Sequence, residues 1–350
     1  KYVKPTKISD KIIVYDYSKQ ISLLEYNIIL YNMEYILWNR KEFDIIYNCT
    51  GINVDDIPIE KRRYPIAAII WYFTWIYILS YIFPLNKNPC YKLLIYLSIL
   101  DISILWLPTF AHGIFSLNGV VYCSSPISTY VSGCFCSFFW AAECSADLIL
   151  GINRCLEIAF PKISKIFFHN NRVYIWIIFC NLYGLYWLLF RHPFIFNGMT
   201  FEYLFDPLIG YKDFRMELFK ADLIETSTHN TILAFGSPII YFVFSLCVFL
   251  KARELINSIS KEEKMVFIQV FIISMLNTST GIFYTYNMSH PDNGILPVII
   301  SHFSWLHIHG FPPVIYLTLN KTVRNDTKKL LAKFFSLFKQ NNVSSMLGPN

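Results

Sequence analysis

The sequence contains little charge for its length. Only 15% of its 350 residues are Asp, Glu, Lys or Arg, whereas 55% are hydrophobic and 18% are aromatic. In ordinary soluble domains about a quarter of the residues are charged, so this composition excludes a typical soluble protein. The mean hydropathy of +0.41 indicates a membrane protein with several spans.

A basic surface for nucleic acid is also absent, although the net charge is +6. The Lys and Arg residues lie between apolar runs and at the chain ends, and they form no patch interleaved with aromatic residues. We therefore exclude nucleic acid as a partner and interpret the charge as a signal of membrane topology. The nine cysteines are mostly isolated within apolar runs, which excludes a dense disulfide scaffold.

What the chain does contain is a series of seven long apolar segments. Several run for about 20 residues without a formal charge, which is enough to cross the hydrocarbon core of a bilayer. We predict an all-α membrane protein with a bundle of seven transmembrane helices. The segments cover residues 64–84, 93–115, 130–152, 173–190, 231–250, 265–286 and 295–319.

The third segment carries a polar face. Glu143, Asp147 and Arg154 are spaced four and seven residues apart, so they share one face of a helix. Charged groups avoid lipid, and this face therefore points into the bundle or into a wet cavity. Two interpretations stay open: the face is internal polar packing, or Arg154, at the end of the span, belongs to a switch.

Lys and Arg are distributed unevenly between the connections. Two short connections, 116–125 and 287–294, have none, whereas the alternate connections and the carboxyl tail are basic. The positive-inside rule then places the amino terminus outside. The cluster Lys61-Arg62-Arg63 is the exception, and Asp55, Asp56 and Glu60 partly offset it.

This topology defines three regions: an extracellular tail at 1–60, the bundle at 61–319 and a cytoplasmic tail at 320–350. Within the last, 328–339 is amphipathic, and we expect a helix there to lie on membrane lipid at the inner surface. Topology also leaves Cys90 and Cys155 in the reducing cytoplasm. The simple extracellular pairing is a disulfide between Cys49 and Cys123, which would tie the tail across the mouth of the bundle.

Several motifs resemble those of G-protein-coupled receptors. At the inner end of the third helix such receptors have an acid-arginine-aromatic triplet, where this chain has Asn153-Arg154-Cys155. The second segment carries a pattern ending in a buried aspartate, Leu97-Ser98-Ile99-Leu100-Asp101. The seventh has a proline-x-x-tyrosine sequence, Pro313-Val314-Ile315-Tyr316.

In detail, the sequences of several motifs are similar to those of the nematode serpentine receptors of class T, a chemoreceptor family. The likeness runs from about residue 47 to residue 316 and is most specific around the third helix. It is carried by Tyr47-Asn48-Cys49-Thr50-Gly51, Cys90-Tyr91-Lys92, Gly119, Tyr122-Cys123-Ser124-Ser125-Pro126, Ile149-Leu150-Gly151-Ile152-Asn153-Arg154-Cys155-Leu156-Glu157-Ile158 and Phe205-Asp206-Pro207.

The resemblance implies a chemosensory receptor in the plasma membrane, in a sensory cilium, that binds a small molecule outside and signals to a heterotrimeric G protein. It implies neither an enzyme nor a cofactor or metal. The coupling switch would comprise Arg154, Asn153, Pro313 and Tyr316. Because Asn153 replaces the usual acid, Arg154 lacks its ordinary partner, and we expect Glu262 or Glu263 to hold the inactive state.

The resemblance also implies a buried sodium-like site at Asp101. Glu143 would supply a second carboxylate there, with Asp147 and Asn277 nearby, and two close carboxylates either share a proton or hold a cation. The alternative is a protonated acid that is hydrogen-bonded to Asn277 or Ser279.

For the ligand we expect an aromatic pocket near the outer surface. An aromatic belt at the membrane interface is the alternative. The expected pocket residues are Trp106, Phe110, His112, Phe283, Tyr286 and Trp305.

Two other functions are kept as alternatives. A membrane hydrolase would bind zinc through Asp101 and some of the four histidines at 112, 302, 307 and 309. The spacing argues against it, because His302 and His307 are five residues apart and His307 and His309 point apart on a helix. A small-solute transporter would show inverted repeats with broken helices in both halves, and the sequence has no such repeat.

Glycosylation mapping tests the topology. We predict sugar on Asn48 and on Asn287, because both asparagines begin sequons in outer segments. The sequons at Asn320, Asn325 and Asn342 face the cytosol and should stay bare. Endoglycosidase digestion of protein from surface membranes is the measurement, and modification of the carboxyl tail would overturn the orientation.

Overall fold

The computed structural model describes residues 43, 45–80, 89–213, 215–254, 261–289 and 294–319, with positions 321, 324, 325, 327–329, 332 and 336. The chain divides into two compact units, Lys1–Tyr31 and Asn32–Asn350, and every described residue belongs to the second. Most of the predicted tail at 1–60 and most of the amphipathic segment at 328–339 lie outside the described residues.

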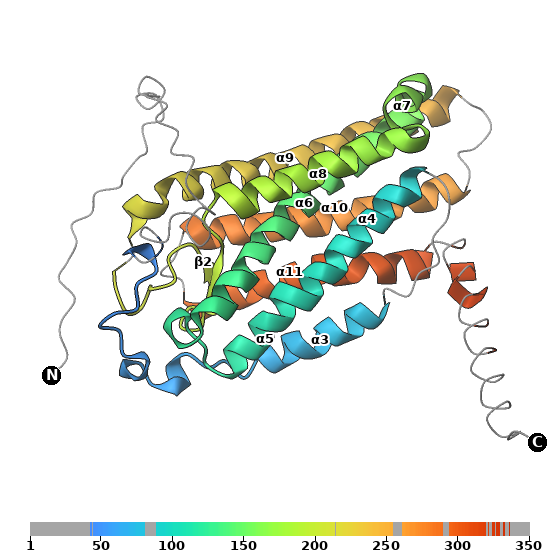
Figure 1. Cartoon of the computed structure of the whole chain (residues 1–350). Coiled ribbons are helices and arrows are strands. Elements are labelled where there is room, and N and C mark those ends of the chain that lie inside the picture. The colour runs from blue at the N-terminus through green and yellow to red at the C-terminus, as the bar shows by residue number, and fades with distance from the viewer. Residues whose placement is uncertain are drawn as a thin grey trace, which may run out of the picture. The chain divides into compact units, whose positions relative to one another are not determined.

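Seven helical segments form a bundle, and each overlaps one predicted apolar segment (Figure 1). They are α3 (Ala67–Ser80), α4 (Pro89–Ile104) with η3 (Leu105–Thr109) and α5 (Phe110–Leu117), α6 (Pro126–Ala159), α8 (Val173–Phe190), α9 (Met216–Glu254), α10 (Lys261–Ser289) and α11 (Ile295–Leu319). By length and composition, the described stretches Pro126–Glu157, Asn170–Phe190 and Met216–Cys247 are able to cross a membrane, and Ala67–Ile78 is a shorter apolar helix.

Shorter elements lie in the connections. An antiparallel hairpin of β1 (Ile195–Asn197) and β2 (Glu202–Leu204) follows α8. A short helix, α7, lies between α6 and α8 and was not predicted from the sequence. The remaining short elements are α7 (Pro161–Phe168) and the 3-10 helices η1 (Val54–Asp56), η2 (Ile59–Lys61), η4 (Tyr122–Ser124) and η5 (Asn170–Arg172).

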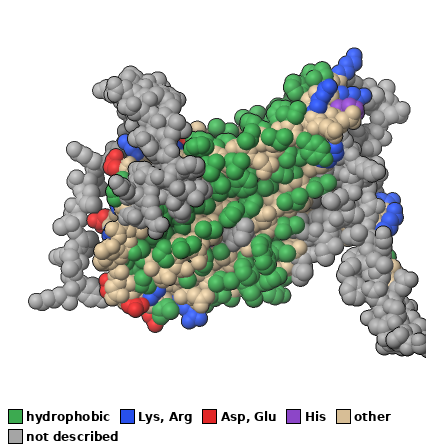
Figure 2. Space-filling model, viewed as in Figure 1, with side chains coloured by type: hydrophobic (Ala, Val, Ile, Leu, Met, Phe, Trp, Pro, Cys, Tyr) green, Lys and Arg blue, Asp and Glu red, His purple; other side chains and the backbone are tan. Residues whose placement is uncertain are grey.

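Helix α6 is central to the bundle and packs against α4, α8 and α9, while α11 packs against α3, α4 and α10. A glycine allows α8 to approach α6 closely. A Cβ atom on Gly184 of α8 would lie 2.8 Å from the carbonyl oxygen of Phe138 in α6, which is typical of small residues at membrane helix contacts. The face of the bundle seen in Figure 2 is largely hydrophobic.

The second segment is not a continuous α-helix. Between α4 and α5 the chain makes a π-helical turn at Leu105–Thr109, which contains Pro108. Proline lacks the backbone N–H that an α-helical turn needs and its ring crowds the preceding turn. A π-turn accommodates such a residue by adding one position to the helix.

The fifth segment is longer than its apolar run, because α9 begins at Met216 and the run begins at residue 231. Ion pairs stabilise the additional turns against the end of α8. Arg191 pairs with Glu225 (2.6 Å) and with Asp222 (3.4 Å), and the ring of His192 lies 2.7 Å from Asp222. Hydropathy could not reveal this extension, since its contacts are polar.

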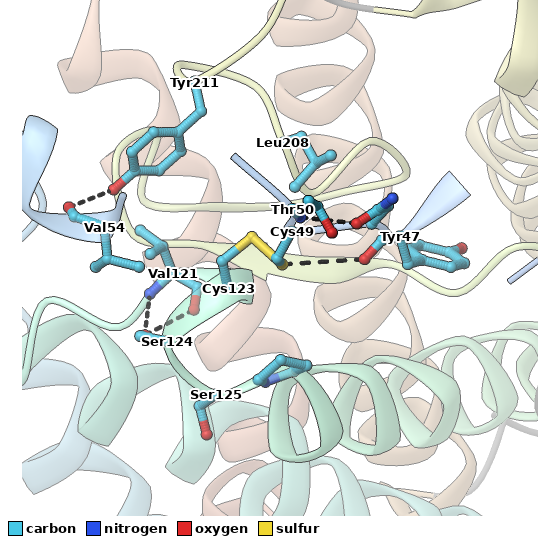
Figure 3. The surroundings of a disulfide bond; sticks show 12 residues. Tyr47, Cys49, Thr50, Val54, Val121, Cys123, Ser124, Ser125, Leu208 and Tyr211 are labelled. Atoms are coloured by element: carbon cyan, nitrogen blue, oxygen red, sulfur yellow. Dashed lines mark hydrogen bonds between the residues drawn. A yellow bond between two sulfur atoms is a disulfide. The ribbon is translucent and has the colours of Figure 1, made fainter. Parts of the chain in front are cut away.

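The segment before α3 is fixed to the outer connections. A disulfide joins Cys49 to Cys123 (Figure 3), which confirms the predicted pairing. The Tyr211 hydroxyl donates a hydrogen bond to the carbonyl oxygen of Val54 (2.8 Å), and Arg215 donates one to that of Ile46 (2.7 Å). Three separate contacts therefore hold residues 46–54.

The basic cluster before α3 has a structural explanation. Arg62 is buried, and it donates hydrogen bonds to the carboxylate of Asp55 (3.0 Å) and to the carbonyl oxygen of Gly119 (2.9 Å). The positive charge of Arg62 is therefore compensated within this connection. Its position does not contradict the orientation inferred from the other loops.

We expect Cys49→Ser to lower the free energy of unfolding by about 2–4 kcal/mol, because the disulfide closes a long loop. The segment should stay docked, since the hydrogen bonds from Arg215 and Tyr211 remain. Thermal unfolding with and without reductant measures the loss. Cys247→Ser, which changes a free cysteine of α9, should not alter the response to reductant. Peptide mapping that finds Cys49 and Cys123 as free thiols in surface-expressed protein would contradict the tether.

Candidate functional site

A polar cluster lies at the centre of the bundle. The Nδ1 atom of His309 in α11 is 3.1 Å from Oδ1 of Asp101 in α4 and 3.1 Å from Oε1 of Glu143 in α6. All three side chains are buried. One imidazole therefore bridges two carboxylates that come from different helices.

The two carboxyl groups of this cluster restrict its possible charge states. Two ionised carboxylates in an apolar interior need a nearby positive charge, which can be a protonated imidazole or a bound cation. The donor atoms of Asp101, Glu143 and His309 lie within 4.8 Å of one another, close enough to hold a metal ion. One nitrogen and two oxygens form a donor set that suits zinc among other divalent ions.

A second polar contact lies beside the first. Nδ2 of Asn277 in α10 donates a hydrogen bond to Oδ2 of Asp147 (2.6 Å). Both side chains line the same cavity as Asp101 and Glu143, which has a volume of about 30 Å³, room for roughly one or two water molecules. The structure thus brings together all four residues that the sequence suggested for a buried polar site. The hydrogen bond from Asn277 goes to Asp147, and His309 contacts Asp101.

His309 is the residue that sequence reasoning missed. It was considered only as one of four histidines for zinc, and helical spacing argued against that group. The signal that could have identified it is its depth, since Asp101 and His309 both lie near the middle of their spans. Depth alone does not show which helices are neighbours.

At the inner end of α6, Arg154 has a partner that the sequence analysis did not consider. Its Nη1 donates to Oε2 of Glu157, one turn further along the same helix, at 3.2 Å. The side chain of Asn153 is buried, and its amide atoms have no hydrogen-bond partner among the described residues.

Pro313 is buried within α11. The side chain of Tyr316 lies outside what the structure describes, as do those of Glu262 and Glu263. These two glutamates lie at the start of α10.

The residues of the expected aromatic pocket differ in burial. Trp106, Phe283 and Tyr286 expose 48%, 39% and 46% of their surface, and Phe110 stacks on Trp106. The exposure of Trp106, Phe283 and Tyr286 is compatible with the alternative, an aromatic belt at the membrane interface. Of the six, only His112 and Trp305 are buried.

A different buried group occupies the outer end of the bundle. The rings of His112 in α5 and His302 in α11 are perpendicular, with centroids 4.4 Å apart. Phe201, in the turn of the hairpin, lies against both rings. The Tyr284 hydroxyl of α10 lies 3.0 Å from Nδ1 of His302. The hairpin therefore covers a buried pair of imidazoles.

The hairpin also carries a carboxyl group that titrates near neutral pH. Burial raises the pKa of Glu202 from 4.5 to about 7. The folded chain therefore keeps this proton at a higher pH than the unfolded chain does. As pH rises from below 4.5 through 7, deprotonation of Glu202 reduces the stability of the fold.

The two predicted sugar sites differ in accessibility. Asn48 is exposed, and its Oδ1 accepts a hydrogen bond from the backbone N–H of Thr50. Asn287 is buried, and its Nδ2, the atom that would carry the sugar, donates to Oγ of Ser301 (2.8 Å). This geometry argues against sugar on Asn287 and leaves Asn48 as the expected site.

Comparisons with known proteins agree with this arrangement. The chain matches the family described as "Serpentine type 7TM GPCR chemoreceptor Srt" over residues 31–340. It is also similar to "Serpentine receptor class T-55" of Caenorhabditis elegans, with 24% identity over 271 residues, which cover 75% of this chain and 70% of that protein. The match includes all seven helical segments of the bundle, and the chain belongs to the class T family of serpentine seven-transmembrane chemoreceptors.

Proposed function

We propose that this receptor binds a small molecule at its outer end and signals to a heterotrimeric G protein at its inner end. The observation that carries the proposal is the polar face of α6. It contacts α11 through Glu143 and α10 through Asp147 at the centre of the bundle, and it ends at Arg154. A displacement of α10 or α11 at the outer end would therefore change contacts on the helix that carries Arg154.

The proposed mechanism needs two arrangements of the polar contacts. In one, Asp147 is bonded to Asn277 and Arg154 to Glu157, as in this structure. In the other, α10 moves away from α6, the Asp147–Asn277 bond breaks, and Arg154 turns toward the G protein. A ligand favours the second arrangement only if it binds that arrangement more tightly.

The proposed orientation follows from charge. The amino-terminal tail at 1–60 is extracellular, the bundle spans 61–319, and the tail at 320–350 is cytoplasmic. The disulfide supports this orientation because disulfides persist in oxidising compartments. We place the receptor in the plasma membrane, and its family membership supports a sensory cilium.

The zinc hydrolase remains the second candidate, because Asp101, Glu143 and His309 are close enough to bind a metal. The histidines that it would need are dispersed. His112 and His302 belong to the outer cluster. The ring of His307 packs against Tyr77 of α3 and Phe311 of α11. Metal analysis of purified protein tests this alternative, and a substrate uptake assay tests a transporter.

We expect His302→Phe to weaken the ligand response about tenfold or more, because it removes a polar group from the buried outer cluster, where an unmade hydrogen bond costs about 1–3 kcal/mol. The matched control is Tyr286→Phe, which also removes one polar group, but from a side chain that is 46% exposed. Dose–response curves in cells, with ligands found by screening volatile and water-soluble compounds, provide the measurement. Equal effects of the two substitutions would contradict a pocket at His302.

Arg154→Ala should abolish ligand-stimulated signalling while surface expression survives. Arg154→Lys is the control that retains the charge. Glu157→Gln should raise basal signalling about twofold, since an i,i+3 ion pair contributes about 0.2–0.5 kcal/mol. Glu262→Ala with Glu263→Ala should also raise it if these residues help to hold the inactive state. If Arg154→Ala signals normally, the arginine serves only topology and helix-end electrostatics.

A further inference from the structure

The turn between α7 and α8 is a well-fixed structure. Phe168 is buried and stacks on Trp176, with ring centroids 5.6 Å apart. The indole Nε1 of Trp176 donates to the carbonyl oxygen of Phe167 (3.1 Å), and Nη1 of Arg172 donates to that of Ile166 (2.6 Å). These contacts satisfy carbonyl groups at the end of α7 and hold Arg172 in a defined position.

An open pocket of about 380 Å³ lies at this turn. It is lined by His169, Asn170, Asn171, Arg172 and Ile175. Asn170 adopts a positive φ of 56°, which asparagine tolerates better than most residues, and this conformation shapes the turn. Four of the five lining side chains are polar or basic, whereas Ile175 is apolar and 64% exposed.

The residues around the pocket carry positive charge, and the surrounding sequence has no acidic residue. Residues 158–201 contain no Asp or Glu, but they include Lys162, Lys165 and Arg172 near the turn. Lys92 of α4 adds a fourth cation, because its Nζ donates to the carbonyl oxygen of Asn170 (3.3 Å). Figure 2 shows Lys, Arg and His side chains gathered at the end of the bundle where α7 lies. Such a cluster attracts an anion.

Exposed apolar side chains surround the same pocket. On α8, a stripe at helical spacing begins at Ile175 and continues through Ile178, Phe179 and Leu182, which are 53–64% exposed. Helix α7 exposes Ile163, Ile166 and Phe167 beside its lysines. A helix with exposed apolar and basic groups at the end of a span is suited to the membrane interface. An anion that binds here would therefore be in contact with lipid chains as well.

We propose that the α7–α8 turn binds the phosphate-bearing headgroup of an anionic phospholipid. The headgroup occupies the pocket beside Arg172, the lysines of α7 pair with its negative charge, and an acyl chain follows the stripe from Ile175 toward Leu182. A free phosphate has the same charge, but it gains nothing from the apolar stripe. The inner-leaflet location rests on the proposed orientation.

The experiment uses the full-length receptor in lipid nanodiscs that contain phosphatidylcholine with a small fraction of phosphatidylserine or phosphatidylinositol 4-phosphate. Both leaflets carry the anionic lipid, so the result does not depend on orientation or signalling. Enrichment of anionic lipid around the receptor is measured by mass spectrometry of co-purified lipid. Lys162→Gln with Lys165→Gln should reduce the enrichment about tenfold, since each surface Lys contributes substantially to binding of anionic lipid.

Two further variants separate a pocket from diffuse attraction. Lys212→Gln with Lys220→Gln removes the same charge from exposed lysines after the hairpin and should leave the enrichment unchanged. Asn171→Trp fills the pocket without changing any charge and should abolish the enrichment. Equal loss in both lysine pairs, or full enrichment with Asn171→Trp, would overturn the proposal. So would competition by millimolar inorganic phosphate, which would assign the site to a free anion.

Discussion

Placing a charge in the middle of an apolar bundle is costly unless another group compensates it, and this requirement governs the centre of the receptor. Asp101, Glu143 and His309 come from three different helices and meet at one nitrogen atom. None of these helices can move along its axis by a turn without separating the group, and breaking a buried pair costs about 3–5 kcal/mol. The cluster therefore fixes the register of α4, α6 and α11 relative to one another, which packing of similar apolar side chains specifies poorly.

The two ends of the bundle are constructed differently. At the outer end, the disulfide, the hairpin and the Asp206–Arg215 ion pair join segments that are far apart in the sequence. At the inner end, the hydrogen bonds from Arg154 to Glu157 and from Arg172 to Ile166 join residues a few positions apart, and single hydrogen bonds, such as that from Lys92 to Asn170, join more distant segments. Local contacts are easier to exchange than distant cross-links, so motion between two states should concentrate at the inner end.

Much of the bundle could be predicted from hydropathy, because lipid and core both demand apolar residues. The limits of α8 and α11 agree with their apolar segments. Features that depend on polar tertiary contacts could not be predicted, such as the first turns of α9 and the role of His309. Whether Trp106 and Tyr286 are buried or exposed could not be predicted either, because a lipid-facing surface and a ligand pocket both favour aromatic residues. The polar residues of the central site were easier to identify, because an ionisable group within a span rarely occurs without a partner.

The π-helical turn at Leu105–Thr109 affects every side chain that follows it. With one residue more than an α-helical turn, it rotates α5 by about 100° relative to an unbroken continuation of α4. In that orientation His112 of α5 is buried. The outer third of this span is thus directed independently of the part that carries Asp101. A related chain that gained or lost a single residue here would present another face of α5 to the outer cluster, with the central site undisturbed. Within such a family, chain length at this turn could diversify chemical recognition as effectively as residue substitution.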